Sequence, residues 1–236
     1  MPATRPGIVI TMFAFTTLFP SAPVADAQSP SAFSRRKAEA LLSNHLPCLG
    51  CHRLNGEGGT IGPDLTSVRE RRSPEYIAAM IADPQDVVPG STMPRTRMPE
   101  PTRELITRYL ASLPGTASSS APSAPPPMVP PSAPSPDGPA LYARWCAACH
   151  GPQGRGDGPN AIHLPVKPAA HSSREAMSAR PDDSLFDTIA SGGAVMNRSP
   201  RMPAFGATLS AAEIRALVRH IRALCRCEGP PWSRGE

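Results

Sequence analysis

Aromatic side chains are scarce in this sequence, whose 236 residues include two Trp, three Tyr and six Phe. Proline, in contrast, occurs 32 times and is concentrated between residues 114 and 139. That segment offers almost nothing to a core and is typical of a semi-rigid linker with polyproline character. The chain is therefore expected to form two small modules on a tether, each marginal if its own side chains alone must fill its core. Something else has to supply core volume.

Long hydrophobic runs are also lacking. Residues 8–19 form an apolar stretch that is shorter than the roughly 20 residues a membrane span needs. Ala25, Asp26 and Ala27 follow as a small-x-small cleavage site, so residues 1–27 are predicted to be a secretory signal peptide cut near Ala27. The alternative is an uncleaved anchor. We expect a periplasmic protein with no stable membrane span after cleavage.

Runs of lysine and arginine are missing as well, although the formal net charge is +5. Nucleic-acid-binding surfaces bring basic residues together, often with aromatic residues between them. The scattered charges here favour an ordinary solvated surface. No nucleic-acid partner is expected.

Six cysteines are present, at positions 48, 51, 146, 149, 225 and 227. In an exported chain they would ordinarily suggest three disulfides. However, the first four lie in CLGCH and CAACH, two C-x-x-C pairs each followed at once by histidine. This pattern indicates covalent haem attachment, because two thiols about one helical turn apart can add to the two vinyl groups of one porphyrin while the next imidazole faces the iron. A thioredoxin-like dithiol would need a βαβ context, and a zinc site would need further ligand pairs.

Each module thus resembles a class I c-type cytochrome, and the chain resembles the exported dihaem cytochromes built from two such modules. The resemblance implies an all-α fold of two cytochrome c-like helical domains, with two covalently attached haem c groups that supply the missing core volume. It makes His52 and His150 the proximal axial ligands. It also implies that the carbonyls of Pro63 and Pro159 accept the other N–H of each imidazole, unless these are ordinary turn prolines. The residues it assigns to covalent attachment are Cys48, Cys51, Cys146 and Cys149.

Apolar stripes at helical spacing predict a first and a last helix in each module, the two helices that cross in this family. Ser73 followed by Pro74 predicts the start of a shorter helix, and Ser210 with Glu213 forms a capping box. Gly192 should end another helix. The predicted helices are 35–46, 74–82, 104–113, 140–146, 182–190 and 211–224. The predicted segments are a signal peptide at 1–27, cytochrome c domains at 28–113 and 140–236, and the linker at 114–139.

Met202 is the expected sixth ligand of the second haem. Its surroundings, RMPAFGATLS, are similar to the methionine loop of the family, and the following proline keeps the methionine extended instead of helical. Met196 lacks that context. His163 and His171 are the remaining alternatives, and otherwise they are loop residues.

The sixth ligand of the first haem is placed by analogy. If Tyr109 in the last helix of the first module matches His220 in that of the second, a methionine is expected near position 91, and Met93 is nearer to it than Met98. Met98 lies just before the helix start expected at Pro101 and Thr102, where iron binding would be sterically tight. Met93 is therefore preferred. Met98, a histidine such as His45, or a vacant position are the alternatives.

Histidine–methionine ligation raises the haem potential because the soft thioether favours ferrous iron. The leading hypothesis is a periplasmic dihaem c-type cytochrome that transfers single electrons, as a soluble carrier or as the cytochrome subunit of a dehydrogenase or oxidase system. Its expected partners are redox proteins: a dehydrogenase, an oxidase or another cytochrome. It would not itself be an enzyme. The alternative, a peroxidase or sulfur-compound oxidase acting at one haem, would need an open or unusual sixth position.

The last two cysteines lie outside this scheme. Cys225 and Cys227 are separated by one residue, which is too close for an unstrained disulfide between them. They are expected to pair with a partner or to remain free thiols. A docking or tethering role for the C-terminal module is a third hypothesis.

Overall fold

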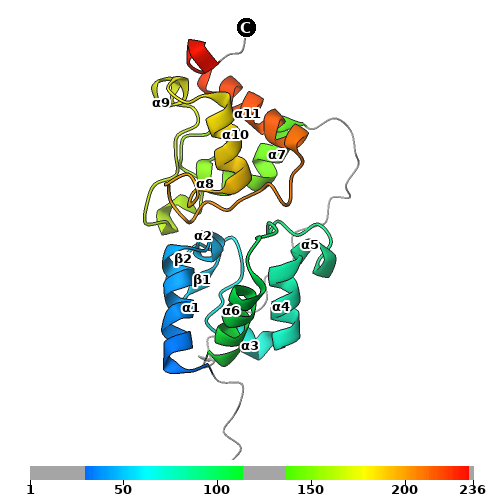
Figure 1. Cartoon of the computed structure of the whole chain (residues 1–236). Helices are drawn as coiled ribbons and strands as arrows, with labels where there is room; N and C mark the ends of the chain where they lie inside the picture. Colours follow the sequence, from blue (N-terminus) through cyan, green and yellow to red (C-terminus); the bar gives the residue numbers. More distant parts are fainter. Residues whose placement is uncertain (1–29, 114–136, 234–236) are drawn as a thin grey trace, which may run out of the picture.

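The structure is a computed structural model that describes residues 30–113 and 137–233. The predicted signal peptide, with its cleavage site near Ala27, and most of the predicted linker lie outside the described residues. Two helical modules are stacked end to end, the first in blue to green and the second in lime to red (Figure 1). The predicted all-α class is confirmed, since the only strands described are two of two residues each. Within the described ranges, no helix has the length and hydropathy needed to cross a bilayer.

The first module consists of short helices around one core. A minimal antiparallel pair of strands follows α2, with Arg53 opposite Gly58 and Leu54 opposite Glu57. The elements are α1 (Ala32–Asn44), α2 (Cys48–Cys51), β1 (Arg53–Leu54), β2 (Glu57–Gly58), α3 (Val68–Arg71), α4 (Pro74–Ala82), α5 (Pro84–Val87) and α6 (Glu100–Ser112).

The second module repeats this plan with a longer loop after its cysteine motif. The elements are α7 (Gly138–Trp145), α8 (Ala147–His150), η1 (Ala161–His163), α9 (Arg174–Ser178), α10 (Asp182–Ser191), α11 (Ala211–Cys225) and η2 (Pro231–Ser233).

The helix predicted at 140–146 begins two residues earlier than expected, since α7 starts at Gly138 and not at Ala140. A Cβ on Gly138 would lie 2.5 Å from the carbonyl oxygen of Ala216, so α7 packs backbone to backbone against α11 from its first residue. Pro139 fits the first helical turn, where no N–H is needed.

The first and last helices of each module pack together, α1 with α6 and α7 with α11. The predicted caps are confirmed: the Ser73 hydroxyl accepts the N–H of Tyr76, and Gly192 ends α10. Ser210 and Glu213 form the capping box, since each side chain accepts the backbone N–H of the other residue, at 3.3 and 2.8 Å. Caps of this kind satisfy N–H groups that have no partner inside the helix.

Each module has its own apolar core. Tyr109 of α6 is 1% exposed in the first core, and Tyr142 of α7 is 1% exposed in the second. The buried residues of the first core are Ala38, Leu42, Leu49, Leu54, Val68, Ile77, Leu105, Ile106, Tyr109, Leu110 and Leu113. Those of the second are Tyr142, Met177, Leu185, Ile189, Phe205, Leu209, Ile214, Leu217, Val218, Ile221, Cys225 and Cys227.

The expectation for the last two cysteines is wrong, because Cys225 and Cys227 form a disulfide with each other. The residue between them, Arg226, ends α11 in the left-handed conformation, with φ 50° and ψ 45°. This turn leaves the two Cα atoms 5.2 Å apart, within the ordinary range for a disulfide. The disulfide therefore closes the C-terminal end of α11.

Candidate haem-binding sites

The four motif cysteines lie on or next to two four-residue helices, α2 and α8. Cys48 and Cys51 begin and end α2, so one helical turn separates their side chains. Cys146 is the N-cap of α8, and Cys149 lies within it. All four thiols are free, in contrast to the paired Cys225 and Cys227. Neither C-x-x-C pair is closed into a disulfide, so both remain available for thioether bonds.

The surroundings of these thiols keep them protonated. Burial raises the pKa of Cys48 to about 11 and that of Cys146 to about 12. The pKa of Cys51 rises to about 12, mainly through burial and further through the proximity of Cys149 in the other module. Dithiol oxidoreductases and zinc sites work with thiolates whose pKa is lowered. In residues 30–113 and 137–233, moreover, no three His, Cys, Asp or Glu side chains gather as a metal site would need.

His52, which follows α2, is held by the backbone. Its Nδ1 lies 2.8 Å from the carbonyl oxygen of Pro63, the contact expected from the sequence. Burial lowers the pKa of His52 and so favours the neutral form of the ring. Since a carbonyl only accepts, Nδ1 carries the proton and Nε2 keeps its lone pair. Gly62 lies against the ring, because a Cβ there would be 2.4 Å from Cε1.

His150 is held in the same way, but not by the expected residue. Its Nδ1 lies 2.9 Å from the carbonyl oxygen of Ala169, so the assignment of this role to Pro159 is wrong. The N–H groups on either side of Pro159 are engaged elsewhere: Gly158 donates to Cys149 and Asn160 donates to Ala148. These bonds hold Pro159 beside α8.

The loop lengths explain why the analogy failed. The accepting carbonyl lies 11 residues after His52 in the first module and 19 residues after His150 in the second. Because the loop after His150 is longer than the loop after His52, a carbonyl later in the chain accepts the hydrogen bond from Nδ1. Burial lowers the pKa of His150 as it does that of His52. Both motifs therefore favour a neutral imidazole in the same tautomer, which fits an axial iron ligand.

His171 was an alternative ligand, and the structure places it against His150. The two rings are stacked, with centroids 4.1 Å apart and planes at 14°. Nδ1 of His171 also lies 2.9 Å from the hydroxyl of Tyr142. This stacking holds His171 beside the imidazole that is expected to be the axial ligand, and its hydrogen-bonding capacity toward Tyr142 is already in use. The sequence offered no signal for this pair.

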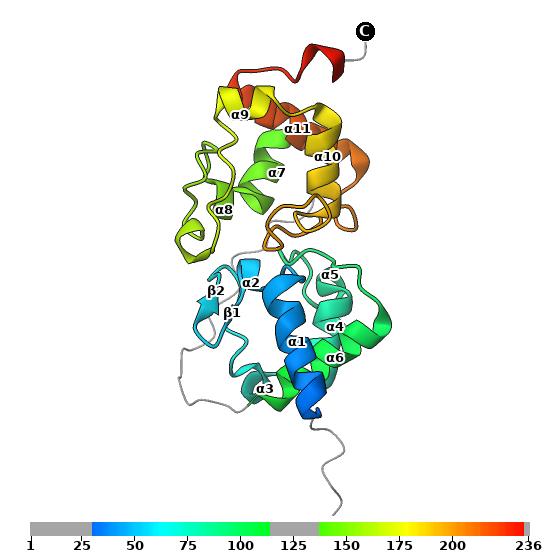
Figure 2. The ribbon, with the colours of Figure 1, turned by 60° about the vertical axis from the view of Figure 1, so that its left-hand side comes forward.

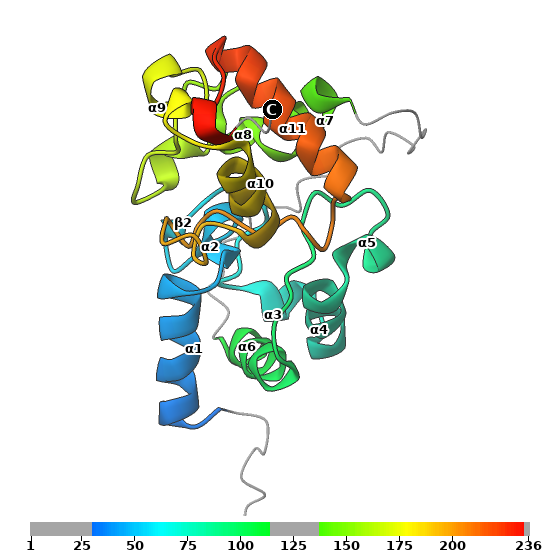
Figure 3. The same ribbon diagram turned by 45° about the horizontal axis from the view of Figure 1, so that its top comes forward.

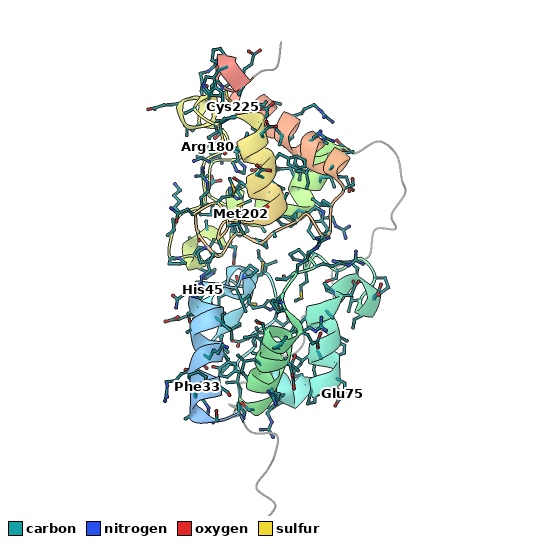
Figure 4. All side chains as sticks on the ribbon, in the orientation of Figure 1. Phe33, His45, Glu75, Arg180, Met202 and Cys225 are labelled. Carbon is teal, nitrogen blue, oxygen red and sulfur yellow. A yellow bond between two sulfur atoms is a disulfide. The ribbon has the colours of Figure 1, made fainter. Side chains whose placement is uncertain are left out.

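Met202 lies in the loop below α10 (Figure 4) and packs against the second core. Its backbone is fixed, since its N–H donates to Ser199 and its carbonyl accepts the N–H of Gly193 at 3.0 Å. Met196 lies earlier in the same loop, and His163 lies in η1. The preference for Met202 stays a prediction.

Met93 is likewise held by its backbone. Its carbonyl accepts from Nε2 of Gln85 at 2.6 Å, and its N–H donates to the hydroxyl of Ser91 at 3.2 Å. Met98 lies two residues before α6 begins at Glu100, even closer to the helix than expected. His45, the histidine alternative, is exposed at the C-terminal end of α1 (Figure 4). The choice of Met93 over Met98 remains a prediction.

Comparison with known proteins gives a match for each module. Residues 38–113 match the family model described as "Cytochrome c". Residues 133–221 match the one described as "Cytochrome C oxidase, cbb3-type, subunit III". Both matches include the cysteine motif of their module, and the first ends at the last described residue before the linker.

Two further proteins resemble the chain over a shorter stretch or more weakly. Cytochrome c oxidase subunit 2 of Alkalihalophilus pseudofirmus is 36% identical over 75 residues, which are 28% of this chain and 22% of that protein. The chain thus covers about a fifth of the length of that curated relative. A chain of the reducing HAO-like protein complex of Kuenenia stuttgartiensis aligns with a TM-score of 0.32 and 24% identity, over 75% of this chain and 79% of that one. A structural likeness this weak carries no weight for the fold or the function.

Proposed function

We propose that this chain, which belongs to the class I c-type cytochromes and carries two tandem modules of that family, transfers single electrons between redox proteins in the periplasm. Each module would hold one covalently attached haem c. When bound, a haem c supplies a one-electron ferric/ferrous couple. The residues of the chain attach it, orient its ligands and exclude water from it.

The observation that carries the proposal is the repeated arrangement at the two motifs. In each module, two free thiols precede a neutral imidazole whose Nδ1–H donates to a backbone carbonyl, at 2.8 Å for His52 and 2.9 Å for His150. Attachment is assigned to Cys48 and Cys51 in the first module and to the matching pair in the second. A backbone acceptor fixes the imidazole plane and raises its basicity as a ligand.

The sixth positions are assigned to Met93 and Met202. A thioether in that position stabilises ferrous iron and leaves no open site for peroxide or a sulfur compound. This favours an electron-transfer protein over a haem enzyme. Both methionines lie in loops, and the backbone N–H and carbonyl of each are hydrogen-bonded, which suits a ligand that must keep a fixed position.

The partners proposed are other redox proteins. One matched family model and one relative carry the names of cytochrome c oxidase subunits, which favours a terminal-oxidase system as the source or destination of electrons. Within that class the chain would act as a soluble carrier or as the cytochrome subunit of a larger dehydrogenase or oxidase. The signal-like residues 1–27 support the periplasm as the compartment.

A spectroelectrochemical titration of the full haem-loaded chain tests this function. We expect two one-electron steps, reduction by ascorbate, a low-spin ferric spectrum with the weak methionine-to-iron charge-transfer band in the red, and no turnover of peroxide. A high-spin ferric centre with peroxide turnover would show that one module is a catalytic haem site and would overturn the proposal for that module.

A further inference from the structure

The two cysteine motifs face each other across the junction between the modules. Figures 1, 2 and 3 all place α2 on the side of the first module that lies next to the second. Asn160, just before η1, is 1% exposed at this junction. A buried amide needs partners for both its N–H groups and its oxygen, and Asn160 finds them on both modules.

The Asn160 side chain links the two motifs directly. Its Nδ2 donates to the carbonyl oxygen of Gly50 at 2.7 Å and contacts Sγ of Cys149 at 3.4 Å. Its Oδ1 accepts the N–H of Thr60 at 2.8 Å. Gly50 directly precedes Cys51 in the first motif. The Asn160 amide therefore links Cys149 of the second module to the backbone next to Cys51 of the first.

Gly50 lies directly against the backbone of the second module. A Cβ on this residue would lie 2.1 Å from the carbonyl oxygen of Arg201, which is a backbone atom and cannot move aside as a side chain could. Arg201 directly precedes Met202, and its Nη1 donates to the carbonyl of Leu42 in α1 at 3.2 Å. The first motif thus touches the second module on both sides, beside Cys149 and beside Met202.

Further hydrogen bonds cross the junction away from the motifs. The N–H of Arg95 donates to Oγ1 of Thr208 at 2.9 Å, and Nη2 of Arg144 donates to the carbonyl of Gly90 at 3.0 Å. Arg95 is itself fixed, because its Nε lies 2.8 Å from both carboxylate oxygens of Asp83. The tether between the modules keeps their effective concentration high, so a few such bonds suffice for docking.

We propose that the two modules dock through their cysteine motifs, with Gly50 as the contact point and Asn160 as a positioning residue, so that an electron crosses from one module to the other within one chain. This inference rests on the proposed function. One electron leaves the reduced module and the oxidised module takes it up; no bond breaks, no proton moves and no co-reactant is needed. One module would then accept the electron from a donor protein, and the other would pass it to an acceptor protein.

Two substitutions separate docking from haem attachment. Gly50→Ala turns CLGCH into CLACH, and the second motif already has Ala148 at the matching position, so attachment should be unaffected while the added Cβ meets Arg201. Asn160→Leu keeps the volume but removes the amide. Thr208→Val is the control, because it removes a hydrogen bond across the same junction without touching either motif.

The test uses the full chain with both haems, partly reduced. Two-dimensional NMR exchange measures how fast the two half-reduced forms interconvert, and solution scattering measures whether the modules are docked. In the unmodified chain we expect a compact shape and an exchange rate independent of protein concentration. Loss of a buried hydrogen bond shifts a docking equilibrium by roughly tenfold, which is the shift expected for Asn160→Leu. Gly50→Ala should shift it at least as far, because the added Cβ would meet the backbone of Arg201. In both variants exchange should slow as the docked fraction seen by scattering falls. Thr208→Val should slow it less.

Two results would overturn the inference. One is exchange in the unmodified chain that rises in proportion to protein concentration, which would mean that electrons pass between separate chains. The other is unchanged exchange in both Gly50→Ala and Asn160→Leu with full haem content. Either result would leave the proposed function standing, since each haem would still take up one electron. Failure of the proposed function would show itself as a high-spin ferric centre or peroxide turnover in the unmodified chain.

Discussion

At the scale of single residues, both motifs use backbone carbonyls to orient histidine. Pro63 and Ala169 serve the same purpose at different distances along the chain. Every residue has a carbonyl, so residue type alone does not say which one accepts this bond; the family resemblance placed it correctly at Pro63 and wrongly at Pro159. The cysteines and histidines could be predicted since their chemistry depends on residue type; the Ala169 contact could not, since it depends only on the path of a loop.

The ligand of the first haem can be decided by two substitutions. Met93→Ala should remove the methionine-to-iron charge-transfer band of one haem and lower the potential of that haem, because the soft sulfur that favours ferrous iron is lost. Met98→Ala should leave both bands intact. Absorption in the red and a redox titration measure this. The reverse pattern would mean that the match of Tyr109 to His220 is wrong.

Tyr142 should make stability depend on alkaline pH. Burial raises its pKa above the ordinary value of 10, so the unfolded chain loses this proton first and the folded state loses stability as pH rises above 10. The loss amounts to about 1.4 kcal/mol per pH unit until the folded group also ionises. In Tyr142→Phe this part of the alkaline loss should vanish, at the cost of the bond to His171.

Denaturant unfolding at pH 8 and pH 11 measures the effect. The free energy of unfolding should fall less between the two pH values in Tyr142→Phe than in the unmodified chain. At pH 8 the variant should be less stable by about 1–3 kcal/mol, because His171 keeps a buried nitrogen without its partner. An equal alkaline loss in both proteins would show that Tyr142 does not carry the dependence.

At the scale of elements, helix starts were easier to predict than interfaces between helices. The Ser73 and Ser210 caps mark where α4 and α11 begin, because a hydroxyl that accepts the first free N–H groups is a local signal. The start of α7 was misplaced since it depends on how closely Gly138 packs against α11. The disulfide after α11 was missed because it depends on the left-handed conformation of Arg226.

The capping box of α11 makes a measurable contribution. Ser210→Ala removes the acceptor for the N–H of Glu213 and should lower the free energy of unfolding by about 1 kcal/mol. Glu213→Gln keeps an oxygen that can accept the N–H of Ser210 and should cost less. Chemical denaturation of both variants measures the difference. Equal losses would mean that the charge of Glu213 matters as much as the hydrogen bonds.

At the scale of the whole molecule, the sequence predicted two modules on a tether but not that they dock. The linker and the repeated motif are visible in composition and spacing. The junction depends on Gly50, Asn160 and Arg201, three residue types that occur on any surface and whose contacts join segments more than 100 residues apart. Only the folded arrangement brings them together.

The central claim is that each cysteine motif holds one haem. Intact-mass measurement of the purified chain, together with the haem-to-protein ratio from its reduced spectrum, tests this most directly. The account predicts two covalently attached haems in the unmodified chain, and one in a variant carrying Cys146→Ser and Cys149→Ser. One haem in the unmodified chain, or two in that variant, would contradict it.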